Sequence, residues 1–312
     1  MKSKKIFIVG CSGTIGETTL KMLSKETDHE IAVSCFELPK HINVIPLNLH
    51  KVSSLSFKEL RKAILEEKPN VIVNCAGISD PIFAEANKKL TWDINVKLVE
   101  HLVSLSKILQ AHLLTFSCEW VFDGNKGPYT EEDRPNPINY VGKSKLAAEN
   151  VVQTTLSSYT IVRLPLVYGT LGKTDFVRKI MNLDQAKGLT LPFSFLTNPV
   201  YADDVAWGIM KIIEMELFGI YHFGGSDIID IMKFINQIYK LVMNDSSPVN
   251  LRPPIFLSSG AVKKFGLQTT FSQAILSLKF TNVLYGLNLY RSQHRKKSIQ
   301  YLDGFDRLKR GF

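Results

Sequence analysis

Three glycines near the amino terminus have the spacing of a dinucleotide-binding turn. The chain reads Gly10-Cys-Ser-Gly13-Thr-Ile-Gly16 directly after a short apolar run, and a helical pattern follows. In such turns the first glycine permits a tight bend, the second lets the backbone approach a diphosphate, and the third allows close packing of helix and strand. Because the N–H groups at the positive end of the helix then face phosphate oxygens, the sequence predicts a cofactor site at Gly10, Gly13, Thr14, Ile15 and Gly16.

An acidic residue follows at the distance at which dinucleotide sites usually hold a ribose. Glu37 stands 21 residues after Gly16, where the second strand is expected to end. A carboxylate there would repel a 2′-phosphate, so the predicted cofactor is NAD or NADP, with NAD preferred. Alternatively, Glu37 is a solvated glutamate, and Lys40 or His41 meets a phosphate.

The cysteines and histidines have no spacing typical of a metal site. Cys11, Cys35, Cys75 and Cys118 are scattered without a CxxC pair, and the seven histidines form no HxH or HxxxH group. Each cysteine lies in or just after an expected strand, where free cysteine behaves as a small apolar residue. We therefore expect no metal, no disulfide framework and a cytoplasmic location.

The elements that must position these residues alternate between short apolar runs and helical patterns. Strands are expected at Lys5–Val9, Glu30–Phe36, Val44–Leu47, Asn70–Asn74, His112–Ser117 and Tyr159–Arg163. Helices are expected at Gly16–Ser24, Ser56–Glu67, Leu90–Gln110 and Val141–Leu156. Because nearly all-apolar strands are typical of sheets covered on both faces, this predicts an α/β fold, a Rossmann-type doubly wound parallel sheet with right-handed crossovers.

The second half of the chain has a different pattern. Two helices, Tyr201–Glu216 and Ile228–Met243, are expected on either side of a short strand, Gly219–Phe223, and no regular alternation is evident in the last sixty residues. Asp203 and Asp204 stand where the first of these helices begins, and we expect them to cap it.

This change of pattern predicts two domains. Residues 1–168 are expected to form an NAD(P)-binding Rossmann domain, with segments near 196–223 returning to it. Residues 169–312 are expected to form a smaller substrate-binding lobe with a divergent C-terminal tail.

Several segments together carry a family resemblance. Besides the glycine turn they are Val71–Gly77, Phe116–Gly124, Gly142–Glu149, Arg163–Gly169, Pro199–Asp204 and Gly219–Phe223. Over residues 1 to about 255 the chain resembles extended short-chain dehydrogenase/reductases, and within them the sugar-nucleotide reductases of the dTDP-4-dehydrorhamnose reductase type. The resemblance implies an NAD(P)-bound reductase acting on a nucleotide-linked 4-keto sugar.

The resemblance also implies how the cofactor is held beyond its diphosphate. By position, Asn48 and Leu49 would meet the adenine, and the amide of Asn48 can accept a hydrogen bond from the adenine amino group. By the same comparison, Cys75, Ala76 and Gly77 would line the ribose.

The resemblance implies catalytic positions as well. Family members protonate the nascent alkoxide from the tyrosine of a YxxxK helix, whose lysine lowers the phenol pKa and holds the ribose, while a hydroxyl after the fifth strand binds the substrate oxygen. Lys145 matches this lysine, but Val141 occupies the tyrosine position and Tyr140 stands one residue early. Cys118 occupies the hydroxyl position, directly after Ser117. The candidate catalytic residues are therefore Lys145, Tyr140, Ser117 and Cys118.

Two functions follow from these replacements and stay open. In the first, Pro135 and Pro137 loosen the start of the helix, so that Tyr140 reaches the site and the protein is an active reductase. In the second, Val141 and Cys118 leave a protein that binds the cofactor or a sugar nucleotide without turnover, and regulates or scaffolds a partner.

Composition limits the possible partners. Of the 312 residues 45% are hydrophobic and 21% charged, as in a globular protein with a core, and no apolar run reaches the length of about 18 residues that a membrane helix needs. The net charge of +9 favours anionic partners. Since much of it lies at the two ends without a nucleic-acid motif, we expect solvated termini, a nucleotide-sugar ligand, no nucleic acid and no membrane, with a homodimer or a partner protein left open.

Overall fold

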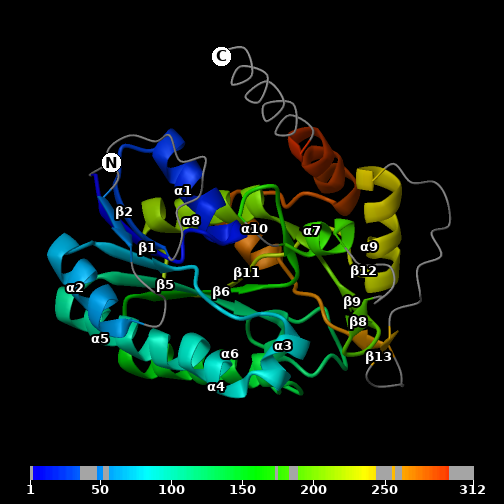
Figure 1. The fold of residues 1–312 in the computed structure, drawn as a ribbon, viewed down its shortest axis with the longest axis horizontal. Helices are drawn as coiled ribbons and strands as arrows, with labels where there is room; N and C mark the ends of the chain where they lie inside the picture. The colour runs from blue at the N-terminus through cyan, green and yellow to red at the C-terminus, as the bar shows by residue number, and fades with distance from the viewer. Residues whose placement is uncertain are drawn as a thin grey trace, which may run out of the picture.

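The predicted Rossmann-type fold is confirmed. The computed structural model describes residues 3–35, 48–51, 56–172, 175–182, 189–243, 255–256 and 262–294. Within these residues the main sheet has seven strands in the order β11-β6-β5-β4-β1-β2-β3, and every pair in it is parallel (Figure 1). The strand order reverses direction between β1 and β4, which is where doubly wound sheets bind ligands.

The elements of the first half agree with the sequence pattern to within a few residues. They are β1 (Lys5–Val9), α1 (Thr14–Glu26), β2 (Glu30–Cys35), β3 (Asn48–Lys51), α2 (Phe57–Glu67), β4 (Val71–Asn74), α3 (Pro81–Ala86), α4 (Lys88–Trp92), a π-helical turn (Asp93–Lys97), α5 (Leu98–Leu109), β5 (His112–Cys118), a 3₁₀ turn (Glu119–Val121), α6 (Tyr140–Thr155) and β6 (Tyr159–Leu164). The strand expected at Val44–Leu47 lies outside the described residues.

The second half contains more regular structure than expected. It has β7 (Val167–Tyr168), α7 (Phe176–Met181), β8 (Thr190–Leu191), β9 (Phe195–Thr197), β10 (Val200–Tyr201), α8 (Ala202–Met215), β11 (Gly219–His222), β12 (Ile229–Asp230), α9 (Ile231–Ile238), a π-helical turn (Tyr239–Met243), β13 (Ile255–Phe256), β14 (Lys263–Lys264) and α10 (Thr270–Leu276). Residues 283–294 form a further helix.

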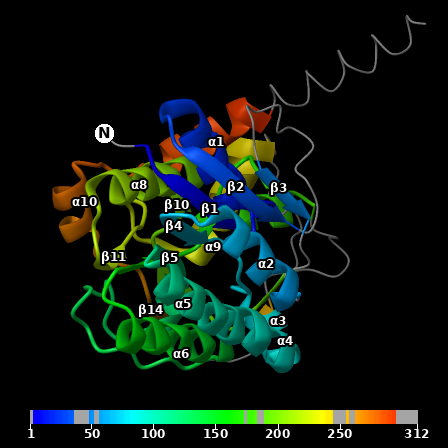
Figure 2. The same ribbon diagram turned by 90° about the vertical axis from the view of Figure 1, so that its left-hand side faces the viewer.

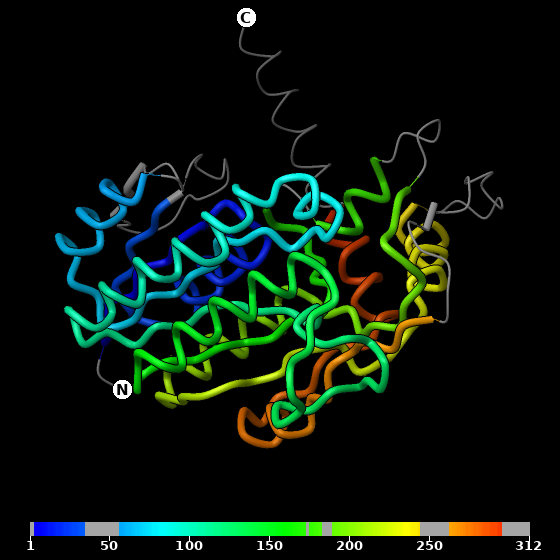
Figure 3. Tube along the Cα trace, turned by 90° about the horizontal axis from the view of Figure 1, so that it is seen from below, coloured from blue at the N-terminus to red at the C-terminus, as the bar shows by residue number. Residues whose placement is uncertain are grey.

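The C-terminal segment, for which the sequence pattern predicted no elements, contains regular structure within the described residues. Val283, Leu287 and Tyr290 are buried and lie at helical spacing. Figure 3 shows the orange segment that contains α10 beside the loop that follows β5, and the backbones of Tyr129 and Gly266 are hydrogen-bonded there. Because this segment packs onto both the sheet and the lobe, its order depends on contacts that the local sequence does not contain.

The sheet is covered on both faces, as its apolar strands predict. Ile6 and Ile8 of β1 face α1 and α8, whereas Phe7 and Val9 face α2, α5 and α6. Figures 1 and 2 show these two helical layers on opposite sides of the sheet. The smaller layer of α7, α9, β9, β12 and β14 packs around a separate apolar cluster beyond the strand ends. The domain boundary at residue 168 stays a prediction. Among the described residues, no helix is long and apolar enough to cross a bilayer.

The expected capping of α8 is wrong. Asp203 and Asp204 lie within its first turn, and neither caps the helix. Asp204 instead accepts hydrogen bonds from the N–H and hydroxyl groups of Thr281, and Asp203 accepts one from Gln293. The two carboxylates thus tie the C-terminal segment to the sheet domain.

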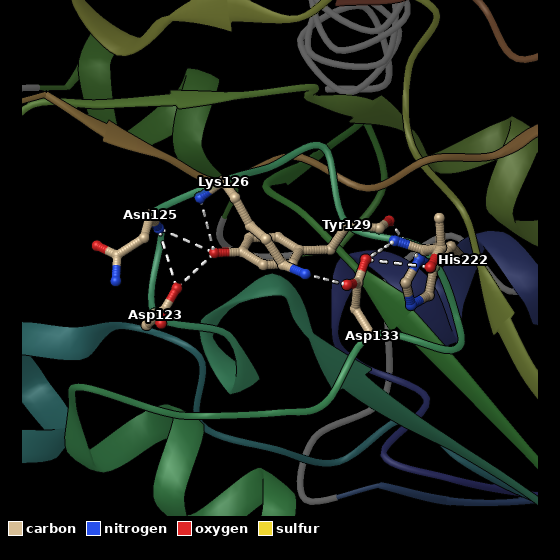
Figure 4. Close-up of polar contacts among 7 residues, drawn as sticks. Asp123, Asn125, Lys126, Tyr129, Asp133 and His222 are labelled. Atoms are coloured by element: carbon tan, nitrogen blue, oxygen red, sulfur yellow. Dashed lines mark hydrogen bonds and ion pairs between the residues drawn. The ribbon is translucent and has the colours of Figure 1, made fainter.

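The loop between the 3₁₀ turn and α6 is ordered by its own polar contacts (Figure 4). The Tyr129 hydroxyl donates to Asp123, and the Lys126 ammonium pairs with Asp133. The carbonyl of Tyr129 lies 3.1 Å from Nδ1 of His222 on β11. Since a carbonyl oxygen only accepts hydrogen bonds, Nδ1 of His222 carries the proton. Burial, and to a smaller extent the positive charge of nearby Arg163, lowers the pKa of this histidine to about 3.

A buried ion pair fixes helix α6 to the sheet. Arg163 of β6 and Glu149 of α6 are each only 2% exposed, and two hydrogen bonds of 3.0 and 2.7 Å join them. A further nitrogen of Arg163 donates to Nε2 of His222, and the guanidinium lies 5.2 Å from the ring centroid of Phe122. This pair therefore sets the position of the helix that carries Lys145.

We predict that Arg163→Met lowers the free energy of unfolding by about 3–5 kcal/mol, because it leaves Glu149 charged and buried without its partner. Urea denaturation measures the change. Lys62→Met is the matched control: its pair with Glu66 is mostly exposed, so its effect stays within about 0.5 kcal/mol. Equal effects of the two substitutions would contradict the role of the buried pair.

Candidate functional site

A cleft of about 950 Å³ opens at the carboxyl ends of the central strands. Its walls are the glycine turn after β1, the loops after β4, β5 and β6, and helix α7 with the start of β8 in the smaller layer. It therefore lies at the point where the strand order reverses, as expected for a ligand site of a doubly wound sheet.

The three glycines of the turn differ in what surrounds them. Gly10 has φ +81°, and a Cβ there would lie 2.8 Å from the N atom of Ala76; a Cβ on Gly16 would lie 2.4 Å from the carbonyl oxygen of Gly10. A Cβ on Gly13 would meet no atom closer than 3.8 Å. Gly13, Thr14 and Ile15 line the cleft. The protein's own packing thus explains Gly10 and Gly16, whereas Gly13 leaves space open to the cleft.

A loop from the second half of the chain lies on this turn. Gly172 donates its N–H to the Glu17 carboxylate at 2.7 Å, and a Cβ on Gly172 would lie 2.4 Å from the N atom of Thr14. Arg178 of α7 donates to the carbonyls of Gly172 and Thr170. Sequence reasoning missed Glu17, Gly172 and Arg178, because no local motif connects segments that lie 155 residues apart.

The predicted adenine and ribose positions are only partly described. Cys75, Ala76 and Gly77 follow β4 and line the cleft, and burial raises the pKa of the Cys75 thiol. The backbones of Asn48 and Leu49 belong to the edge strand β3. Their side chains, together with Glu37, Lys40 and His41, lie outside the described residues. The preference for NAD over NADP stays a prediction.

Lys145 lies on the floor of the cleft. Its side chain is 8% exposed, and its ammonium donates to the carbonyl of Phe116 at 2.9 Å. A Cβ on Gly77 would lie 2.8 Å from Nζ, so glycine at 77 leaves room for the lysine. Burial lowers the pKa of Lys145, while Cys118 and Glu149 oppose this shift.

The two residues at the end of β5 also line the cleft. The Ser117 hydroxyl is buried and has no hydrogen-bond partner among the described residues. Burial raises the pKa of the Cys118 thiol to about 12, so this thiol is neutral at physiological pH. Among the described residues, no three histidine, cysteine, aspartate or glutamate side chains are grouped to hold a metal ion.

Helix α6 begins regularly, without the loosened first turn that the first of the two alternatives requires. Asn139 caps it by accepting the Gly142 N–H at 2.9 Å. Tyr140, the first helical residue, donates its N–H to Glu85, and its ring lies 5.6 Å from the ammonium of Lys88. Tyr140 is not among the residues that line the cleft. The cap fixes the helical register, so neighbouring side chains point about 100° apart.

Val141 takes the position that the family pattern gives to tyrosine. It is fully buried, in the apolar cluster that contains Cys118 and Trp120. One helical turn separates it from Lys145, so the two share a face of α6. The structure therefore brings together Lys145, Ser117 and Cys118, and leaves Tyr140 outside.

A buried carboxyl group beside Cys118 was missed from the sequence. Glu119 is 1% exposed, and it accepts hydrogen bonds from the Thr197 hydroxyl at 2.8 Å and the Gly266 N–H at 3.1 Å. Burial raises its pKa to about 8 in spite of these hydrogen bonds. Both partners come from the second half of the chain, so its sequence position alone carried no signal.

Comparisons with known proteins show which family the chain resembles. A family model described as RmlD substrate binding domain matches residues 4–255. Methionine adenosyltransferase 2 subunit beta of Xenopus laevis is 26% identical in an alignment 242 residues long, and the match covers 72% of this chain and 68% of that protein. The dTDP-4-dehydrorhamnose reductase of Aggregatibacter actinomycetemcomitans is 26% identical in an alignment 244 residues long, and the match covers 75% of this chain and 78% of that protein.

A solved structure shows the same fold. The crystal structure of dTDP-4-dehydrorhamnose reductase from Bacillus anthracis str. Ames, in complex with NADP, superposes with a TM-score of 0.74 at 22% sequence identity. The match covers 94% of this chain and 100% of that one.

The raised pKa of Glu119 generates a prediction on stability. Between pH 4.5, the ordinary pKa of a glutamate, and about pH 8, the Glu119 carboxyl is ionised in the unfolded chain but stays protonated in the folded protein. The free energy of unfolding therefore falls as pH rises through this window. Glu119→Gln can still accept the hydrogen bonds from Thr197 and Gly266 but does not titrate. We predict that this substitution makes the free energy of unfolding less dependent on pH and that the variant is more stable than the unsubstituted protein at pH 8.

Urea denaturation at several pH values between 4.5 and 8 measures this effect. Glu59→Gln is the matched control, because Glu59 is exposed on α2. A Glu119→Gln protein with an unchanged pH dependence would show that this carboxyl ionises normally in the fold.

Proposed function

The chain belongs to the RmlD substrate binding domain family, and from this membership and the cleft we propose that it binds a nicotinamide dinucleotide and reduces a nucleotide-linked 4-keto sugar. The observation that carries the proposal is the open space at Gly13, beside the N-terminus of α1 and in one cleft with Lys145. Nothing in the protein's packing requires glycine at 13, whereas a diphosphate against the backbone does.

The residues of the cleft fit the dinucleotide. The N–H groups of Thr14 and Ile15 would bind its diphosphate, and Ala76 and Gly77 would line its ribose. Lys145 would hold the ribose hydroxyls by turning from the Phe116 carbonyl. When bound, the dinucleotide supplies the hydride. Its presence in the Bacillus anthracis reductase supports a nicotinamide cofactor here without deciding between NAD and NADP.

The groups available to the substrate carbonyl are few. Ser117 has a buried hydroxyl without a partner among the described residues, so it is free to donate to an oxygen in the cleft. The Lys145 ammonium lies in the same cleft and stabilises negative charge on that oxygen. Because Val141 supplies no phenol, and one positioned acid contributes about 10²–10⁴ in rate, we expect slow reduction.

A second candidate function follows from the same replacements. Val141 is buried in the apolar cluster next to the cleft, and Cys118 lines the cleft with a weakly donating thiol, so neither supplies the phenol or the hydroxyl of the family pattern. The protein then binds the dinucleotide or a sugar nucleotide and regulates or scaffolds a partner. The similarity to methionine adenosyltransferase 2 subunit beta is compatible with this alternative, since that protein is named as a subunit of an enzyme, but the equal identity to a dTDP-4-dehydrorhamnose reductase does not make it the better supported one. The cytoplasmic location and a homodimer or partner protein stay predictions.

We predict that Gly13→Ala weakens binding of NADH and NADPH at least about tenfold while the free energy of unfolding stays within about 0.5 kcal/mol. The added methyl group meets no protein atom closer than 3.8 Å but occupies the space proposed for the diphosphate. Calorimetric titration measures the affinity. Gly16→Ala is the control: its Cβ would lie 2.4 Å from a carbonyl oxygen, so it destabilises the fold. The proposal fails if the unsubstituted protein binds neither coenzyme.

We predict that Val141→Tyr together with Cys118→Thr raises the rate of NADPH oxidation with dTDP-4-dehydrorhamnose by about 10²–10⁴. The pair restores the proton donor on the face of Lys145 and the hydroxyl at the end of β5. Val141→Phe with Cys118→Thr is the control that adds the ring without its hydroxyl. Equal rates of these two double variants would contradict the proposal that a tyrosine hydroxyl at position 141 donates the proton. Turnover by the unsubstituted protein at ordinary enzymatic rates would eliminate the second candidate function.

A further inference from the structure

An ion pair spans the cleft between the sheet domain and the smaller layer. The ammonium of Lys179, on α7, lies 2.9 Å from Oδ2 of Asp80, which follows β4 and stands 99 residues earlier in the chain. Both residues line the cleft, and their side chains are 49% and 43% exposed. The pair is therefore at the rim of the cleft, in contact with solvent.

The pair lies on the side of the cleft away from the expected adenosine end of a dinucleotide. The sheet places β2 and β3 on one side of β1, and β4, β5 and β6 on the other. Doubly wound sheets hold the adenosine ribose at the end of the second strand, whereas Asp80 follows β4. Because Lys179 reaches the cleft from α7 of the smaller layer, which the sequence predicts to bind the substrate, an anion bound at Lys179 would belong to the substrate half.

The cationic side chains that line the cleft differ in how strongly their present partners hold them. Lys145 is buried and donates to a backbone carbonyl, and Arg178 donates to the carbonyls of the loop on the glycine turn. Lys179 contacts an exposed carboxylate, and exposed pairs of this kind contribute little to stability. Of these three cations, Lys179 can change its partner at the lowest cost.

Asp80 does not depend on the lysine for its place. Its Oδ1 caps α3 by accepting the N–H groups of Ile82 and Phe83, and Oδ2 accepts from Lys179. Burial acts to raise the pKa of Asp80, but the hydrogen bonds from Lys179 and Phe83 lower it below its ordinary value. Asp80 is therefore an ionised carboxylate that holds Lys179 by one oxygen.

We propose that Lys179 binds the diphosphate of the nucleotide-linked ligand, and that Asp80 holds this lysine across the cleft until the diphosphate replaces the carboxylate. The inference rests on the proposed function, because it assigns the anionic part of the proposed substrate. Two phosphates carry more charge than one carboxylate and make stronger hydrogen bonds to an ammonium. The ring of Phe83, 44% exposed at the same rim, offers an apolar face to the nucleoside.

The test is calorimetric titration with dTDP of four proteins: the unsubstituted chain, Lys179→Gln, Asp80→Asn and Lys143→Gln. Lys179→Gln is expected to bind dTDP about tenfold more weakly and with a smaller dependence on salt. Asp80→Asn is expected to bind it about two- to fivefold more tightly, because asparagine keeps the cap on α3 without competing for the lysine. Lys143, exposed on α6 outside the cleft, is the control and leaves the affinity unchanged.

Titration of the same proteins with NADPH separates this inference from the proposed function. Unchanged NADPH affinity in Lys179→Gln supports the assignment to the substrate half. The inference is overturned if Lys179→Gln binds dTDP normally, if it loses NADPH instead, or if Asp80→Asn weakens dTDP binding as a merely structural bridge would. If the unsubstituted chain binds dTDP through Lys179 but binds neither coenzyme, the proposed function is contradicted and this inference is not.

Discussion

The close approach of helix α1 to the end of β1 is the constraint on which the site depends. A side chain at Gly16 would overlap the carbonyl of Gly10, and one at Gly10 would overlap the loop after β4. Because both positions are glycine, the N-terminus of α1 points into the cleft between β1 and β4, where the strand order reverses. A helix N-terminus is positive and has unpaired N–H groups, so an anionic ligand is favoured there before any side chain contributes.

The chemistry of the cleft is decided by helix α6, which two independent contacts hold in register. Asn139 caps its first turn, and the buried pair of Glu149 with Arg163 fixes the turn after Lys145. With both ends of this segment fixed, Tyr140 cannot exchange places with Val141. The protein thus keeps the lysine that would hold a ribose and lacks the phenol that would protonate a product. This combination is what makes reduction and non-catalytic binding both reasonable functions for one cleft.

The smaller layer completes the cleft through residues that are far apart in the sequence. Glu119 reaches Thr197 and Gly266, Gly172 rests on the glycine turn, and Lys179 meets Asp80. These contacts join the two halves of the chain around the ligand space. A nucleotide-linked ligand bound as proposed would therefore depend on the described parts of the C-terminal half, including the segment from 262 to 294, whose Gly266 binds Glu119.

The sequence by itself determined the sheet, its helical layers, the glycine turn and the family, because strand–helix alternation and glycine spacing are local patterns that burial on both faces of the sheet imposes. It also located Lys145 and the absence of tyrosine at 141, since helical register is read along the chain. Only the tertiary structure decided that Tyr140 does not line the cleft, that Asp203 and Asp204 bind the C-terminal segment, and that residues 283–294 form a helix. It alone brought Glu119, Arg178 and Lys179 to the cleft. These features depend on contacts between segments that are distant in the sequence, and a local sequence pattern does not show which distant segments will be in contact.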